Sequence, residues 1–313
     1  MMTDDSIKIP IGTHHFLQRY LLAFATQAEV LNHVRTQAIG EEAERIPGIL
    51  ESWNKLQPKV TELVRVESGL PDTIGIEPVP DECQPYLESV TRDPLFQKTF
   101  ASLPSRFAMV EIDKLVAPQR TVNLDYVRKL SHRFSKSPNL AELLDFCVSH
   151  KREMDPIQHL EIAQNTHVFS SPNSDIRFLG AFVKDLADED LNYAVLGGLP
   201  AAAIIAFIGY GGAPLNAFLA GRRVILNNGF HRAYALRSIG VTRIPLVIQQ
   251  VRNAQLEFPP VVLGLPKEYL LNFQRPVLMK DFFVPEFAIT LKVRERIKMV
   301  TLGIALNQHD VPA

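Results

Sequence analysis

Three observations on this chain of 313 residues predict an α+β protein. The apolar fraction of 46% and the charged fraction of 21% are typical of a globular protein with a sizeable core. Apolar residues recur at helical spacing over much of residues 14–66. Short apolar runs bounded by turn residues, as strands are, characterise residues 203–250. A chain of this length forms one large domain or two modest ones.

The first hundred residues are expected to be mainly helical. Apolar spacing predicts one helix over about residues 14–39 and a second helical stretch over about residues 41–66, with interruptions at Pro47 and Pro58. Residues 70–85 contain four prolines, which disfavour both helix interiors and central strands. This segment is therefore expected to be a linker.

The remainder is expected to combine strands and helices. Strands are expected at residues 107–115, 203–208 (buried), 215–219 and 224–227 (a hairpin around Gly221), and 243–250. Helices are expected from the capping residue Asn123 to Phe134, at about Leu140–His150 and Asp155–Asn165, and from Gly229 to Ile239, where Gly240 ends the helix. Alternation over residues 287–293 and 296–302 predicts a second hairpin near the C-terminus.

Charge and composition exclude several classes of protein. The formal net charge of −1 excludes a globally basic nucleic-acid coater and a highly charged disordered chain. The two cysteines cannot make a disulfide scaffold, and neither they nor the histidines have metal-site spacing, so no metal site is predicted. Glycines and prolines divide the uncharged stretch 191–221 into pieces too short to span a membrane. The acidic N-terminus does not resemble a signal peptide, so a cytoplasmic location is expected.

The charge is unevenly distributed, and its basic part contains the most informative motif. Residues 1–113 carry 10 basic and 17 acidic side chains, whereas residues 191–256 carry six arginines and no acid. Within that arginine block, an Asn-Asn-Gly turn leads from a predicted strand into a predicted helix, with Asn228 and Gly229 in the turn and His231 and Arg232 in the first helical turn. A helix N-terminus has free N–H groups and a partial positive charge. The turn is therefore a candidate anion cradle.

The segment NNGFHRAYALRSIG resembles the signature of the ParB/sulfiredoxin superfamily, in which a strand, a glycine turn and a helix hold nucleotide phosphates. The resemblance covers about residues 105–252, with an insertion at about 136–200. It leaves residues 1–104 as a helical N-terminal region with a proline-rich linker and residues 253–313 as a C-terminal extension that carries the hairpin. In this alignment Gln119 and Arg120 follow the first strand, and Lys129 and Arg133 lie on the next helix at positions that approach the phosphate.

The sequence also departs from the family at positions that carry chemistry. Phe230 occupies the position of the sulfiredoxin catalytic cysteine, and Pro118-Gln119-Arg120 replaces the loop that holds the glutamate of the serine kinases. No Glu-Asn-x-x-Arg motif or downstream helix-turn-helix, as found in chromosome-partition members, is present. Whether the chain is an enzyme is therefore left open.

The resemblance implies a binder of ATP, ADP or CTP, with Mg²⁺ as a companion ion and phosphohydrolase or phosphotransferase activity as an option. The acids at 185 and 188–190 could hold Mg²⁺, although such a charge run is more often a solvated helix end. A non-catalytic adaptor and a DNA-binding or nuclease-like ParB-family protein are the alternatives. A membrane partner is not expected, and a nucleotide is preferred to nucleic acid.

Overall fold

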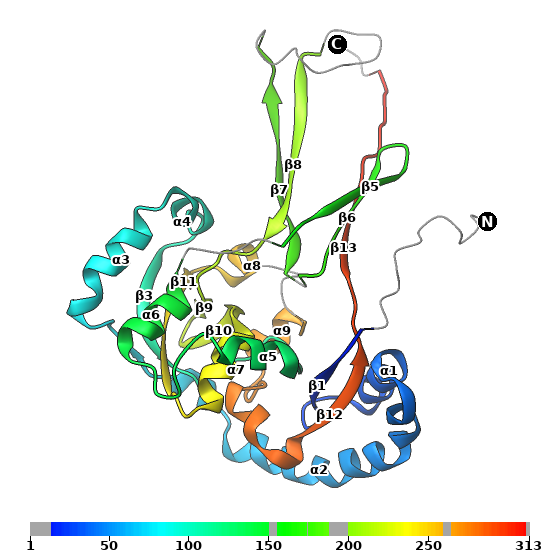
Figure 1. The fold of residues 1–313 in the computed structure, drawn as a ribbon, viewed down its shortest axis with the longest axis vertical. Helices are drawn as coiled ribbons and strands as arrows, with labels where there is room; N and C mark the ends of the chain where they lie inside the picture. Colours follow the sequence, from blue (N-terminus) through cyan, green and yellow to red (C-terminus); the bar gives the residue numbers. More distant parts are fainter. Residues whose placement is uncertain (1–13, 150–154, 174, 188–199, 259–263, 311–313) are drawn as a thin grey trace. The chain divides into compact units, whose positions relative to one another are not determined.

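The computed structural model describes residues 14–149, 155–173, 175–187, 200–258 and 264–310 (Figure 1). It is 37% helical and 32% strand, which confirms an α+β protein. The chain divides into two compact units, which are described separately. Unit 1 comprises the described residues of 153–211 and 296–313, and unit 2 comprises those of 13–152 and 212–295.

Unit 2 contains a five-stranded and a three-stranded sheet. The larger sheet has the order β10-β9-β11-β3-β2, in which neighbours are antiparallel except for the parallel pair β9 and β11. Its strands are β2 (Ile76–Glu77), β3 (Ser105–Glu111), β9 (Asn216–Ala220), β10 (Arg223–Asn228) and β11 (Arg243–Val251). The smaller sheet has the antiparallel order β12-β1-β4, with β1 (His15–Leu21), β4 (Thr121–Asn123) and β12 (Ala288–Arg294).

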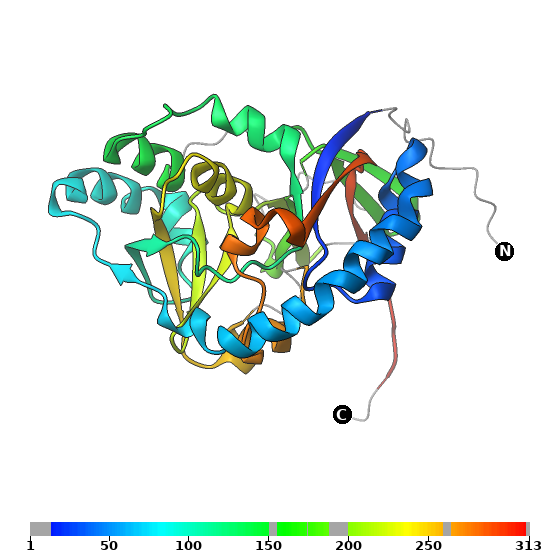
Figure 2. The same ribbon diagram turned by 90° about the horizontal axis from the view of Figure 1, so that it is seen from below.

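Helices surround these sheets. The α-helices of unit 2 are α1 (Gln27–Gln37), α2 (Ile46–Val66), α3 (Gln84–Thr91), α4 (Pro94–Thr99), α5 (Leu124–Ser131), α6 (Leu140–Val148), α7 (Phe230–Ser238), α8 (Ala254–Glu257) and α9 (Lys267–Asn272). The 3₁₀ turns are η1 (Gly40–Arg45), η2 (Leu70–Thr73), η3 (Asp81–Cys83), η5 (Met279–Phe283) and η6 (Pro285–Phe287). Figure 2, which views the molecule from below, shows α5, α6 and α7 together on one side of the larger sheet.

The core of unit 2 lies around the central strands of the larger sheet. Ala217, Ile225 and Leu246, from three adjacent strands, have no exposed surface. Arg223 is buried at the start of β10, where its guanidinium pairs with Asp72 at 3.0 Å and donates to the carbonyls of Leu270, Leu271 and Phe273. These bonds satisfy a buried cation and orient the last carbonyls of α9.

The structure confirms most of the elements expected between residues 105 and 251. Strand β3, the β9–β10 hairpin around Gly221, helices α5, α6 and α7, and strand β11 all lie where the sequence places them. Asn123 caps α5 by accepting the Tyr126 N–H at 2.9 Å, and Gly240 follows α7 at a φ of 90°. Local signals were sufficient here because capping residues and turn glycines mark the ends of these elements.

The N-terminal expectations need three corrections. Residues 15–21 form strand β1 rather than the start of a helix, and the helix begins only at Gln27, after a capping box made by Thr26. Helix α2 continues through Pro58 without a break. Residues 70–85 are not a detached linker, because β2 pairs with β3, and Pro71 and Val79 are buried.

Unit 1 consists of strands in the part of the chain that the structure describes. A three-stranded sheet of order β13-β6-β5 contains β5 (Gln158–Ala163), β6 (Thr166–Ser171) and β13 (Lys298–Gly303), and β7 (Ile176–Asp185) pairs with β8 (Ala202–Tyr210). The helix expected at 155–165 is therefore wrong. Asn165, at a φ of 58°, makes the turn of a hairpin there, a conformation that asparagine tolerates well.

Two further corrections concern strands with unexpected surroundings. The C-terminal hairpin expected over 287–302 is wrong, because β12 pairs with β1, whereas β13 pairs with β6. The strand expected at 203–208 is present as β8, but it is not buried, since Ile204 is 69% exposed and Phe207 is 49% exposed. Alternating sequences specify strands but not their partners. Residues 191–199 of the uncharged stretch lie outside the described residues.

Candidate functional site

The Asn-Asn-Gly turn joins β10 to α7 through a glycine that the structure requires. Gly229 has a φ of 93°, and a Cβ at this position would lie 2.5 Å from Cγ of Leu215. Asn228 fixes the turn from the other side, since its Nδ2 donates to the carbonyl of Gly212 at 2.6 Å. Helix α7 then begins without a side-chain cap and without an acid in its first turn. The helix N-terminus therefore retains a partial positive charge that no side chain of its own neutralises.

His231 is a neutral, structural histidine at this helix end. Its Nε2 accepts the backbone N–H of Asn123 at 3.1 Å, and its ring lies edge-on to Tyr126 with the ring centroids 5.4 Å apart. Desolvation by burial lowers the pKa of His231 to about 4. The imidazole is thus uncharged at neutral pH, and it ties the N-termini of α5 and α7 together.

The structure brings two of the expected cations to the C-terminal end of α6. Nη1 of Arg232 donates to the carbonyls of Phe146 and Cys147, both at 3.3 Å. The guanidinium of Arg133 lies over the ring of Phe146, 5.8 Å from its centroid. The negative end of the α6 dipole favours cations at this place. Arg133 and Arg232 therefore both contact residues at the end of α6.

The other expected site residues have different surroundings. Lys129 is exposed on α5. Nε2 of Gln119 donates to the carbonyl of Thr121 at 2.6 Å, and Arg120 pairs with Glu29 of α1 at 2.8 Å. These bonds attach Gln119 to β4 and Arg120 to α1.

The sequence analysis missed a charged cavity of about 330 Å³ at the opposite end of α7. Arg237, in the last turn of α7, makes two hydrogen bonds with Asp113 on its wall. The carboxylate of Glu67 pairs with Nζ of Lys280 at 2.7 Å and with Nε of the buried Arg275 at 2.8 Å. Leu63, Phe283, Val284 and Phe287 supply an apolar wall. The charged residues of this cavity come from segments that are far apart in the sequence, so no local motif could predict it.

The ion pairs of this cavity have a structural explanation. Arg275 has no exposed surface and also pairs with the buried Asp281 at 2.6 Å, which leaves both charges compensated. This network joins the end of α2 to η5. The cavity is large enough for a small ligand, but its charged side chains already satisfy one another.

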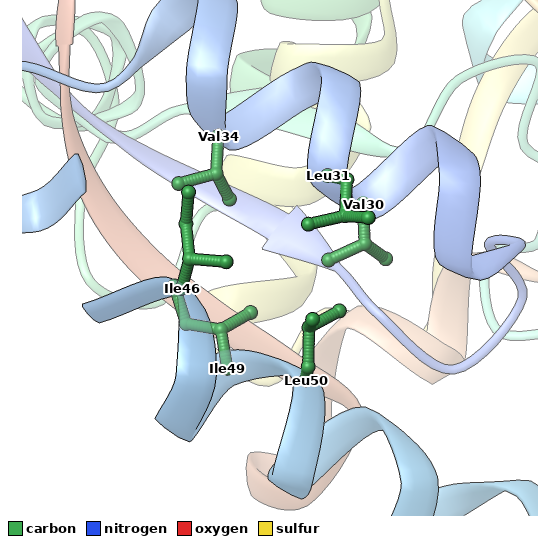
Figure 3. Close-up of a pocket in the computed structure, with 6 residues that line it drawn as sticks. All are labelled: Val30, Leu31, Val34, Ile46, Ile49 and Leu50. Atoms are coloured by element: carbon green, nitrogen blue, oxygen red, sulfur yellow. The ribbon is translucent and has the colours of Figure 1, made fainter. Parts of the chain in front are cut away.

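The space between helices α1 and α2 is not a ligand-binding site. Figure 3 shows Val30, Leu31 and Val34 of α1 facing Ile46, Ile49 and Leu50 of α2. The space between them does not admit a water molecule, so this is a helix–helix contact rather than a binding site.

The described residues contain no group of three His, Cys, Asp or Glu side chains placed to hold a metal ion. Of the acids considered for Mg²⁺, Asp185 lies in β7 of unit 1, and residues 188–190 lie outside the described part of the chain.

Comparisons with known proteins add no further constraint on the site. None of the helices in the described part of the chain is both long enough and apolar enough to cross a membrane. No protein-family model, curated protein or solved structure matches this chain.

Proposed function

We propose that unit 2 binds a nucleotide or another phosphate ligand at the first turn of α7. The observation that carries this proposal is a helix that begins at a left-handed glycine, with neither a side-chain cap nor an acid in its first turn. Backbone N–H groups at such an end donate to phosphate oxygens, and the helix dipole favours their negative charge.

Arg232 is the first charged group for this ligand. It lies in the first turn of α7, and its Nη1 donates to the carbonyls of Phe146 and Cys147 at 3.3 Å. A phosphate oxygen at this helix end would accept a charge-assisted bond from its guanidinium. Arg133 is the second cation of this neighbourhood through its contact with Phe146.

The proposal assigns the chain to the ParB/sulfiredoxin superfamily as a divergent member. The succession of β10, Gly229, α7 and β11 supports the assignment. Phe230 is buried and packs against Phe282 with the ring centroids 5.3 Å apart, so it holds the helix in place and offers no nucleophile. The function proposed is accordingly ligand binding, without sulfinic-acid reduction.

Binding of ATP, ADP, CTP and inorganic phosphate can be measured by calorimetry at physiological salt. The Arg232→Ala variant is expected to bind about 10- to 100-fold more weakly, which corresponds to the loss of one charge-assisted bond of about 1.5–3 kcal/mol. Arg222→Ala is the matched control, because Arg222 is exposed and precedes the opposite end of β10. Equal losses in the two variants, or no binding by the natural chain, would contradict the proposal.

Nucleic acid is the second candidate, favoured by the six arginines of residues 191–256. The structure engages several of them: Arg223 pairs with Asp72, Arg237 with Asp113, and Arg243 with Glu77. Paired guanidinium groups contribute little to a basic surface. Mononucleotide binding is therefore expected to exceed duplex binding at the same salt. A gel shift with a short random duplex, run beside the calorimetry, decides between the two ligands.

A further inference from the structure

The cavity at the C-terminal end of α7 has balanced charges but unused hydrogen-bond donors. Two ion pairs line it, Arg237 with Asp113 and Lys280 with Glu67. Arg237 uses two of its five N–H groups on Asp113, and Lys280 uses one of its three on Glu67. In the part of the chain that the structure describes, the remaining N–H groups of these two side chains have no hydrogen-bond partner. The cavity can therefore donate further hydrogen bonds to a ligand.

The carboxylates of the same two ion pairs can also accept further hydrogen bonds. Each oxygen of Asp113 accepts one bond from Arg237, and the two oxygens of Glu67 accept one bond each, from Lys280 and from Arg275. An ionised carboxylate offers about four acceptor sites, so about half of the sites on each acid are unused. The four side chains of the two pairs are 22–32% exposed, so water reaches them.

An apolar wall lies beside these charges. Its side chains are those of Leu63, Phe283, Val284 and Phe287. The ring of Phe283 stacks on Tyr234 with the centroids 4.7 Å apart, and the guanidinium of Arg237 lies over the same ring, 5.1 Å from its centroid. These contacts hold Arg237 in place before any ligand binds. An apolar lining with a few fixed polar groups is the usual composition of a small-molecule site.

The balance of charges restricts the ligand that this cavity can take. A ligand that fills the cavity displaces water from two cations and two anions, which is costly unless the ligand replaces the lost hydrogen bonds. An anion would serve the cations but would lie close to two carboxylates, and a cation would meet the reverse difficulty. A ligand that carries one positive and one negative group serves both kinds of side chain and leaves the net charge of the cavity unchanged.

We propose that this cavity binds a small zwitterion with an apolar body, namely an apolar α-amino acid. Arg237 and Asp113 are in direct contact, so a ligand with both charges on one carbon atom can bond to both of them. The carboxylate accepts from the unused N–H groups of Arg237, the ammonium donates to Asp113, and the side chain packs against the apolar wall. This site is separate from the phosphate site proposed at the first turn of α7, so either proposal can fail without the other.

Calorimetry of the full, natural chain with L-leucine and L-phenylalanine tests the proposal. The matched analogues of leucine are 4-methylpentanoate, which lacks the ammonium group, and 3-methylbutylamine, which lacks the carboxylate. Leucine is expected to bind, and each analogue is expected to bind at least about 10-fold more weakly, because it leaves one kind of charged side chain without a partner. An analogue that binds as tightly as leucine, or no binding of either amino acid at millimolar concentration, overturns the proposal.

A pair of arginine variants locates the site. Arg237→Gln is expected to weaken leucine binding about 10-fold or more, because it removes the charge that faces the carboxylate. Arg65→Gln is the matched control, since Arg65 is 73% exposed and pairs with Glu62 within α2. Fluorescence of Trp53, the single tryptophan, verifies that unit 2 remains folded. Equal affinity for leucine in the two folded variants overturns the assignment, and if Arg237→Gln does not fold, the comparison of leucine with its analogues on the natural chain decides.

Discussion

The hydrogen bond that holds His231 requires a neutral imidazole and is lost when acid protonates the ring. The Asn123 N–H donates to its Nε2, and protonation of that nitrogen would remove the acceptor and bury a charge. The histidine therefore contributes to stability only in its neutral form, whatever its role toward a ligand.

We expect this histidine to make the protein sensitive to mild acid. Its folded pKa, about 4, lies below the unfolded value near 6.5, so its contribution is complete above pH 6.5 and is lost as the pH falls toward 4. The full shift corresponds to about 3 kcal/mol. Urea unfolding at several pH values should show a smaller loss of stability in His231→Gln than in the natural chain.

His132, exposed at the end of α5, provides the control for this experiment. The His132→Gln variant should keep the pH dependence of the natural chain. A pH dependence that is the same in all three proteins would show that His231 ionises as freely when folded as when unfolded.

At the scale of elements, the junction of β10 and α7 depends on Gly229. We expect Gly229→Ala to destabilise unit 2 by about 2–4 kcal/mol, because the methyl group meets Leu215 and the backbone conformation is left-handed. Gly221→Ala is the control, since Gly221 has a similar left-handed φ of 62° but no atom within 4 Å of the added Cβ. Its cost should be about 1 kcal/mol. Equal midpoints of urea unfolding for the two variants would refute the packing argument.

The contrast between β1 and α7 explains how far the sequence could predict the elements. Helix α7 is bounded by two left-handed glycines, Gly229 and Gly240, so the residues next to the helix mark where it begins and ends. Strand β1 has apolar residues that also fit a helix, and its conformation is decided by pairing with β12, near the far end of the chain. The spacing of apolar residues within one segment does not show which distant segment it pairs with.

The same distinction applies to the candidate site. Asn228, Gly229, His231 and Arg232 are contiguous, so a motif could identify them. The bond from Asn123 to His231 and the contacts of Arg232 with the end of α6 are tertiary contacts that no local pattern contains. The sequence therefore shows the residues of the turn as one motif, but it does not show what each of them bonds to.

At the scale of the whole molecule, the two units differ in how much core they possess. Unit 2 encloses many fully buried side chains, whereas the described part of unit 1 buries three residues. We expect unit 1 to lose its structure at a lower urea concentration than unit 2, because buried apolar surface is the main stabilising term. Trp53, whose Nε1 donates to the Ala25 carbonyl, reports on unit 2 alone.

Comparing the urea unfolding transitions recorded by two probes measures this difference in stability directly. Far-ultraviolet circular dichroism should begin to change at lower urea than the fluorescence of Trp53, because dichroism records the strands of both units. Superimposable transitions in the natural chain would mean that the units unfold as one cooperative body.

The pairing of β1 with β12 also sets an order of events on the ribosome. Its register joins His15 to Arg294 and Leu21 to Ala288, so β1 is synthesised well before the strand that it pairs with. At elongation rates of about 5–20 residues per second, this delay is on the order of half a minute. Throughout that time β1 lacks its partner strand and exposes an apolar edge, which makes this segment a natural client for a chaperone that holds extended segments.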